Sequence, residues 1–177
     1  FSFERVNKSG AKFDPEKNKW FNHQYLIKQE DATLAKAYAP ILVEKGFTVD
    51  ESVLTKVVSL IKERAHFVSE FWDLSDYFFV APQSYDEKAS KNWKEETPEL
   101  MRRVIDVLAN IEDFRSANIE TILKDWMAQN EIGMGKVMQP LRLSLVGALK
   151  GPHLFDIAEI IGKDETVSRI KKAISDL

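Results

Sequence analysis

The stretch DESVLTKVVSLI, residues 50–61, decides the fold class. Its apolar residues recur three and four positions apart, which is the spacing of side chains on one face of an α-helix. Asp50 precedes this run, and aspartate is preferred just before a helix because its carboxylate accepts hydrogen bonds from free backbone amides. The stretch therefore predicts a helix that begins after Asp50 and buries one apolar stripe, made of Val53, Leu54, Val57, Val58 and Ile61.

The sequence before this stretch predicts two further helices. The tripeptide DPE at residues 14–16 combines a capping aspartate, a proline at the first helical position and an acid in the first turn. A second helix should span about residues 31–46, and Pro40 within it should end or kink it. We expect the first of these helices to bury three aromatic side chains at helical spacing, namely Trp20, Phe21 and Tyr25.

The sequence after residue 85 predicts another set of helices. The tripeptide TPE at residues 97–99 repeats the cap-and-proline start signal, and Asn118 should open the next helix. A further helix should span about residues 136–149, and a short one should include residues 155–161. The last helix should begin after a cap at Asp164. The alternation of apolar and polar residues that marks a strand is nowhere sustained. We therefore predict an all-α fold.

A change in composition near Tyr85 predicts the domain organisation. Residues 71–80 are dense in large apolar side chains, whereas residues 85–96 are mostly charged or polar. A shift of this kind marks a boundary between packed units. We expect two consecutive helical modules, residues 1–85 and residues 86–177.

The overall composition excludes several classes of protein. The net charge is −3, so the chain is no general binder of polyanions, although locally concentrated positive charge could still bind nucleic acid. The absence of cysteine excludes disulfides and cysteine-ligated zinc, and it fits a reducing compartment such as the cytoplasm. No apolar run is long enough to predict a membrane span. We expect a monomer without a membrane partner.

The sequence contains no recognisable catalytic or metal-binding pattern. His23, His66 and His153 are far apart along the chain, and none has a second ligand at metal-binding spacing. The tetrapeptide GMGK at residues 133–136 resembles a phosphate-binding loop only faintly, because the longer spacer and the following Ser or Thr are missing. We expect no catalytic residue, metal or cofactor in this chain.

One window stands out as a candidate binding surface. Residues 132–155 contain no Asp or Glu, although the chain has 28 of these residues, and they carry Lys136, Arg142 and Lys150. The local positive potential would attract phosphates. A Gly-Pro pair at residues 151–152 should end one helix and start the next, leaving backbone amides free to face a ligand. Burial of a helical hairpin would explain the missing carboxylates equally well, so both interpretations stay open.

A second basic cluster lies near the start of the chain. Lys8 and Lys12 belong to it, and they could contact a phosphate backbone. The cluster also contains acidic residues, and a solvated surface is the commoner explanation for such a mixture.

Two separated stretches resemble a known family. Residues 1–25 contain FSFERV, then KSGAKFD, then KWFN with QY close behind, and they are similar to the segment that follows the second signature loop of glutamyl-tRNA synthetases. GKVMQPLR at residues 135–142 and GPHLF at residues 151–155 resemble the most recognisable part of the C-terminal domain of that family. The resemblance covers nearly the whole chain in the right order. His23 departs from it, because the family commonly has glycine there.

The resemblance implies the C-terminal, anticodon-binding half of a glutamyl-tRNA synthetase, with that family's cage of helices. Both ATP-binding signatures of the family are missing, so we expect this chain to be a fragment that does not activate glutamate. ATP and Mg²⁺ would belong to the full-length parent, which attaches glutamate to its tRNA. The implied partner is the anticodon arm of tRNA(Glu).

The resemblance also implies roles for particular residues. Arg64 matches the arginine that contacts the third anticodon base, where a planar fork of donors favours cytosine over the guanine of tRNA for glutamine. Without the resemblance, Arg64 would be interpreted as part of a surface ion pair, for example with Glu63. Gln139 and Arg142 match positions near the second and first bases. The loop that receives the first base is matched by Gly151, Pro152 and Leu154.

A function of a different class is also open. The apolar residues between Phe71 and Phe79 could form the docking surface of a helical protein-interaction module that binds no RNA. This alternative would explain an acidic chain without catalytic residues. Binding of an anticodon stem-loop that weakens steeply with salt separates the two functions.

Overall fold

The computed structural model describes residues 14–177, and every regular element within them is a helix. The predicted all-α fold is therefore confirmed. Lys8 and Lys12, the two lysines expected to contact phosphates, lie outside the described residues.

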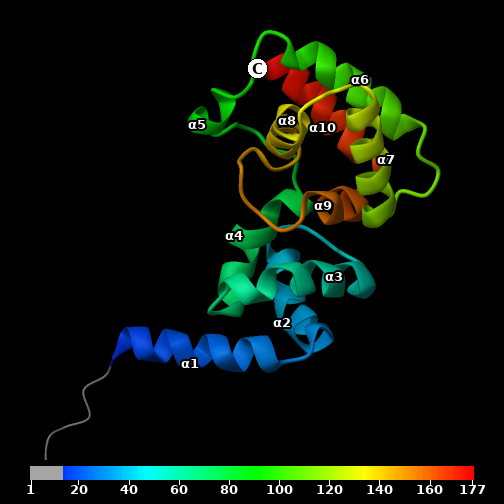
Figure 1. Ribbon diagram of the computed structural model, residues 1–177. Coiled ribbons are helices and arrows are strands. Elements are labelled where there is room, and N and C mark those ends of the chain that lie inside the picture. Colours follow the sequence, from blue (N-terminus) through cyan, green and yellow to red (C-terminus); the bar gives the residue numbers. More distant parts are fainter. Residues whose placement is uncertain (1–13) are drawn as a thin grey trace, which may run out of the picture.

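The first half of the described chain holds the helices that precede residue 85. Its elements are α1 (Pro15–Lys28), α2 (Asp31–Glu44), α3 (Glu51–Ile61), η2 (Lys62–Arg64), η3 (Val68–Glu70), α4 (Phe71–Ser75) and η4 (Asp76–Phe78). The second half contains α5 (Glu87–Ser90), α6 (Thr97–Ala109), α7 (Ser116–Gln129), α8 (Met134–Val146), α9 (Leu154–Ile161) and α10 (Lys163–Asp176). In Figure 1, α6 to α10 form one lobe, α2 to α4 lie beneath it, and α1 extends along the far edge.

The helix starts predicted at Asp14 and Asp50 are confirmed. The Asp14 carboxylate accepts hydrogen bonds from the amides of Glu16 at 3.1 Å and Lys17 at 3.2 Å. The Asp50 carboxylate accepts one from the amide of Ser52 at 2.8 Å. Four of the five predicted stripe residues of α3, Leu54, Val57, Val58 and Ile61, are buried, and Val53 is half-buried.

Other predicted helix limits need correction. Pro40 does not end α2, which continues to Glu44. Thr97 is the first residue of α6 rather than its cap, and its hydroxyl accepts a hydrogen bond from the Lys94 amide at 2.9 Å. The helices α7 and α8 begin two residues earlier than expected, and α10 begins at Lys163, which places Asp164 in its first turn.

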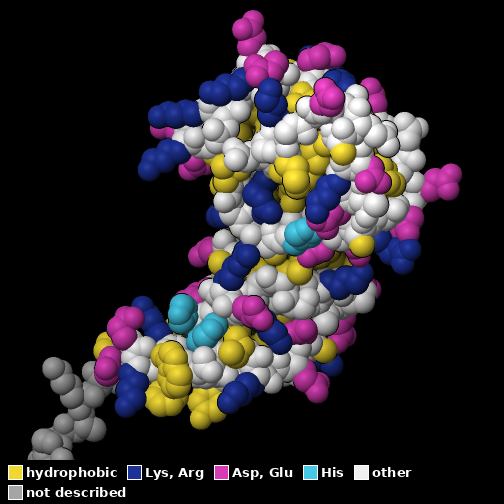
Figure 2. Space-filling model, viewed as in Figure 1, with side chains coloured by type: hydrophobic (Ala, Val, Ile, Leu, Met, Phe, Trp, Pro, Cys, Tyr) yellow, Lys and Arg dark blue, Asp and Glu magenta, His cyan; other side chains and the backbone are white. Residues whose placement is uncertain are grey.

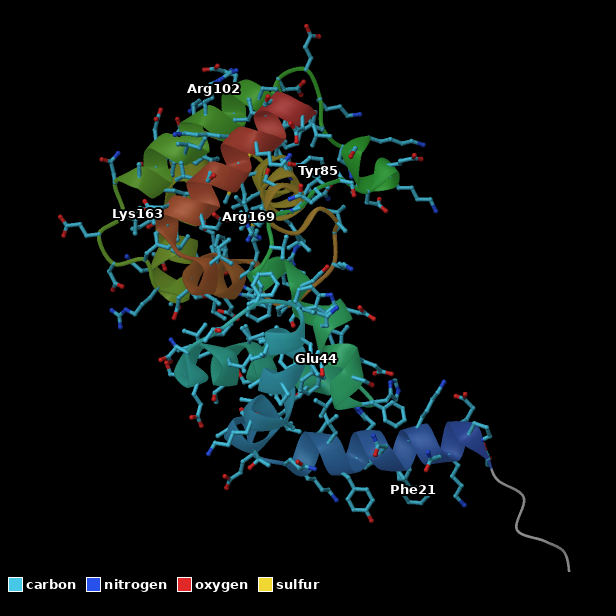
Figure 3. The ribbon with its side chains drawn as sticks, turned by 180° about the vertical axis from the view of Figure 1, so that it is seen from behind. Phe21, Glu44, Tyr85, Arg102, Lys163 and Arg169 are labelled. Carbon is cyan, nitrogen blue, oxygen red and sulfur yellow. The ribbon has the colours of Figure 1, made fainter. Side chains whose placement is uncertain are left out.

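The predicted burial of aromatic residues on α1 is wrong. Trp20, Phe21 and Tyr25 are 56%, 44% and 69% exposed, and Leu26 is the buried residue of this helix. Figure 3 shows Phe21 on the side of α1 that faces away from the other helices. Helical spacing identifies side chains that share a face, but it does not identify the element that covers that face.

The core is one continuous cluster of apolar side chains that runs from Leu26 on α1 to Ile170 on α10. Arg169 ties the two halves of the chain together, because its buried guanidinium donates to the carbonyls of Tyr77 at 2.6 Å and Leu145 at 2.8 Å. Figure 3 shows Arg169 in the middle of the upper lobe. The division into modules at residue 85 stays a prediction.

The apolar residues between Phe71 and Phe79 belong mainly to this core. Phe71, Tyr77 and Phe78 are buried, and Trp72 stacks on Phe79 with ring centroids 6.3 Å apart. The stretch therefore does not form the exposed docking surface that a protein-interaction module would need. None of the helices in residues 14–177 is long and apolar enough to cross a membrane.

Candidate nucleic-acid interface

The helix α8 and the loop after it form the first part of the candidate site. The helix ends at Gly147, which adopts φ +79°, a left-handed conformation that glycine reaches at little cost. The loop of residues 147–153 then leads to α9. Gly151 in this loop also has a positive φ of +102°. The sequence thus places glycine at the two positions, 147 and 151, where the backbone of this turn has a positive φ.

Arg142 holds this loop in shape. Its Nη1 donates to the carbonyl of Lys150 at 3.0 Å and to that of Pro152 at 2.8 Å. Burial lowers the pKa of the Arg142 guanidinium, although an arginine remains charged at neutral pH. Nη2 and Nε make no hydrogen bond to another described residue. Arg142 therefore fixes the loop with one nitrogen and keeps donors for a ligand.

The window without acidic residues, 132–155, contains both buried apolar side chains and exposed cationic ones. Val137, Leu141 and the run of residues 143–147 are buried, as expected for a helical hairpin in the core. Lys136, Gln139 and Lys150 are exposed on the same segment. Burial is thus shown for one face of α8, and the interpretation of the exposed residues as a binding surface stays a prediction.

Gln139 and Lys136 line a hollow beside the start of α6. The hollow has a volume of about 360 Å³ and is also lined by Asn92, Lys94 and Thr97. Two lysines, two side-chain amides and the carboxylate of Glu96 line this space, so it presents both donors and acceptors to a polar ligand. Figure 2 shows further Lys and Arg side chains in dark blue over α5, on the side where the molecule is hollowed between α5 and α1.

Arg64 supplies the second part of the candidate site. It ends the short helix η2 and is exposed, and its side chain forms neither a hydrogen bond nor an ion pair with any residue of the range 14–177. The surface ion pair with Glu63 considered from the sequence is absent from that range. Burial raises the pKa of the Tyr77 phenol; the positive charges of Arg64 and Arg142 oppose this rise, and the negative charge of Asp76 adds to it.

A family model described as an anticodon binding domain matches residues 31–174. The chain belongs to this family. The glutamate–tRNA ligase of Flavobacterium johnsoniae is 77% identical over 177 residues, and that of Porphyromonas gingivalis is 43% identical over 178 residues. Each match covers 100% of this chain and 35% of the relative, so the chain spans about a third of the length of these relatives.

A solved structure agrees with this assignment to the anticodon-binding family. A crystal structure of a glutamate tRNA ligase from Elizabethkingia meningosepticum, in complex with its amino acid, superposes with a TM-score of 0.93 at 43% identity. The superposition covers 100% of this chain and 35% of that chain. The resemblance inferred from the sequence and the expected helical architecture are both confirmed.

The structure places the predicted residues of this anticodon-binding domain in two ways. Arg64, Lys136, Gln139 and Lys150 are exposed and can touch a ligand directly. Pro152 and Leu154 are buried, and Gly151 is half-buried, so these three give the loop its shape. The separation of contacting residues from shaping residues is a property of the folded chain that spacing alone does not provide.

Tyr77 is a residue of this site that the sequence did not single out. Its side chain is 4% exposed, and its hydroxyl has no hydrogen-bond partner among the described residues. A Cβ atom added to Gly151 would lie 3.2 Å from that hydroxyl, so Tyr77 forms the floor beneath the loop. In the sequence it stood within an apolar stretch and gave no separate signal. Within residues 14–177, no group of acidic or histidine side chains could hold a metal ion.

Proposed function

We propose that this chain recognises the anticodon arm of tRNA(Glu) as the C-terminal part of a glutamate–tRNA ligase. The parent enzyme attaches glutamate to its tRNA in the cytoplasm, and ATP and Mg²⁺ bind to its catalytic half. In this proposal the chain binds RNA as a monomer and contributes no catalytic group.

One observation supports the proposal above all others. Arg142 holds loop 147–153 through the carbonyls of Lys150 and Pro152, two of its three guanidinium nitrogens have no partner among the described residues, and the exposed Lys150 lies on that loop. In a chain of net charge −3, this local excess of positive charge favours a ligand with phosphates. Arginine planes and exposed donors are also the groups that bind unstacked bases of RNA loops.

The proposed roles follow the position of each side chain. Arg64, which is exposed and unpaired within the described residues, donates to the third anticodon base and favours cytosine over guanine. Gln139 reads the second base, and the free donors of Arg142 contact the first. Half-buried Gly151 presents the backbone that receives the first base, buried Pro152 and Leu154 hold that backbone in place, and Lys136 and Lys150 approach phosphates.

A gel-shift titration tests this function. The 177-residue chain is titrated into anticodon stem-loops of the glutamate type and of the glutamine type at several salt concentrations. We expect tighter binding to the glutamate type, and an affinity that falls steeply as salt rises because counterions are released from the phosphates. Equal binding of both stem-loops, or no binding at low salt, would contradict the proposal.

A further inference from the structure

The segment that carries Arg64 is fastened to α1 immediately after this arginine. His23 Nδ1 lies 2.7 Å from the carbonyl oxygen of Ala65, and Asn22 Nδ2 donates to the carbonyl of His66. Because a carbonyl oxygen can only accept, Nδ1 of His23 carries the hydrogen. The two partners, Ala65 and His66, follow Arg64 directly in the sequence. Figure 2 shows two histidine side chains in cyan side by side beside α1, and the rings of His23 and His66 have centroids 5.5 Å apart.

The same segment is fastened on its other side as well. Lys62 Nζ lies 2.6 Å from a carboxylate oxygen of Asp31 and donates to the carbonyl of Gln29 at 3.3 Å. After Arg64, the Glu70 carboxylate accepts a hydrogen bond from the amide of His66 at 2.7 Å. This backbone hydrogen bond lowers the pKa of Glu70, so the carboxylate is the form that holds the segment.

Arg64 thus combines a held backbone with an unoccupied side chain. Lys62 pairs with Asp31 and donates to Gln29, and Ala65 and His66 are hydrogen-bonded to α1 and to Glu70. The guanidinium of Arg64 contacts none of these groups. A binding group needs a supporting residue that fixes its direction, because an arginine on a loose turn would lose much conformational freedom on binding. Hydrogen bonds from α1 to two successive carbonyls supply such support.

We infer that Asn22 and His23 are positioning residues that set the direction of Arg64, and hence its preference among bases at the third anticodon position. The inference rests on the proposed function of Arg64. It assigns to α1 a part in base discrimination that acts through the backbone immediately after Arg64. Lys62 and Glu70 complete the same support from the other side of the segment.

Nearly isosteric substitutions test this inference. Asn22→Asp keeps the shape of the side chain but replaces the donor to the His66 carbonyl with a second acceptor. His23→Phe keeps a ring next to His66 but removes the donor to the Ala65 carbonyl. His23→Gln restores an N–H donor and should rescue discrimination. Tyr25→Ala removes a large side chain that is 69% exposed on the same helix, and it serves as the matched control.

The measured quantity is the ratio of dissociation constants for stem-loops that carry guanine or cytosine at the third anticodon position. We expect Asn22→Asp and His23→Phe each to lower this ratio about fivefold, the usual effect of losing one hydrogen bond. The dependence of affinity on salt should stay that of the unsubstituted chain, because no phosphate contact is lost. Tyr25→Ala and His23→Gln should keep the original ratio.

The outcomes separate this inference from the function on which it rests. If Arg64→Gln abolishes the preference while Asn22→Asp and His23→Phe retain it, the positioning role is overturned and the role of Arg64 stands. If the unsubstituted chain shows no preference, the role of Arg64 is overturned and the positioning role with it. Amide hydrogen exchange shows whether Asn22→Asp unfolds α1. If it does, the difference between the ratios measured for His23→Phe and His23→Gln alone decides whether the positioning role stands.

Discussion

Segment 62–66 and loop 147–153 use arginine in opposite ways. In segment 62–66, the side chains of Asn22, His23 and Glu70 hold the backbone, and Arg64 extends from it without a partner among the described residues. In loop 147–153, Arg142 reaches in from α8 and holds two backbone carbonyls. The first region presents a side chain on a fixed backbone, whereas the second presents a backbone fixed by a side chain. The comparison shows that an arginine in this fold can extend from a fixed backbone or can itself fix a backbone.

The largest effect should come from Gly147→Ala, which breaks the start of the shaped loop. A Cβ at this position would lie 2.8 Å from the carbonyl oxygen of Ser84 and 3.1 Å from Cβ of Pro82, at a φ of +79°. The strain of an alanine in a left-handed backbone conformation and the close contacts of its Cβ should together lower the free energy of unfolding by about 3 kcal/mol. Urea denaturation followed by circular dichroism measures this loss.

Gly46→Ala is the control for Gly147→Ala. Gly46 has a similar φ of +87°, but nothing lies within 4 Å of an added Cβ. Its substitution should therefore cost about 1 kcal/mol, from backbone strain alone. Equal losses at both glycines would show that loop 147–153 can relax away from Ser84, and the contrast with segment 62–66 would weaken.

Arg142→Ala should have the next largest effect, on RNA binding. The substitution removes the donors that hold the loop and those left free for a base. We expect binding of the glutamate-type stem-loop to weaken by about 1–3 kcal/mol, the range found for loss of one stacked base. Arg102→Ala is matched in charge and lies on the exposed side of α6, where its guanidinium pairs with Glu99 at 3.1 Å. If both substitutions weaken binding equally, Arg142 acts only through net charge.

Arg64→Gln should chiefly change selectivity. The loss of a planar fork of donors should reduce the preference for cytosine over guanine at the third anticodon base by about tenfold. The same measurement on Arg64→Lys separates charge from direction, because lysine keeps the charge but cannot form the fork. The Arg64→Lys variant should retain most of the affinity for the stem-loop and lose the preference for cytosine over guanine. A variant that discriminates as well as the unsubstituted chain would remove Arg64 from the site.

The sequence was sufficient to predict those features that depend on local chemistry. The caps at Asp14 and Asp50 and the buried stripe of α3 follow from the spacing of a few neighbouring residues, and the structure confirms them. The exposure of Trp20 and Tyr25 could not be predicted, because it depends on whether a distant element covers α1. Spacing predicts which side chains share a face, and only the tertiary fold shows what lies against it.

The candidate site also has some features that the local sequence predicts and others that depend on the tertiary fold. The local excess of positive charge around Arg142 and Lys150 is visible in the sequence, because residues 132–155 lack acidic side chains. The use of Arg142 to hold Pro152, and the burial of Pro152, depend on how the loop folds back. The place of Tyr77 beneath Gly151 joins residues 74 positions apart, and no local pattern indicates it.

Tyr77→Phe should have the smallest effect, and it tests the side chain beneath loop 147–153. The Tyr77 hydroxyl is buried without a hydrogen-bond partner among the described residues, so its removal relieves a desolvation cost and leaves the ring in place. We expect the free energy of unfolding to stay the same or rise by up to about 1 kcal/mol. Tyr38→Phe is the matched control, because the Tyr38 hydroxyl lies 2.8 Å from Oγ of Ser75 and its loss should cost about 1 kcal/mol. A clear loss of stability in Tyr77→Phe would mean that this hydroxyl is hydrogen-bonded in solution, next to Gly151 of loop 147–153.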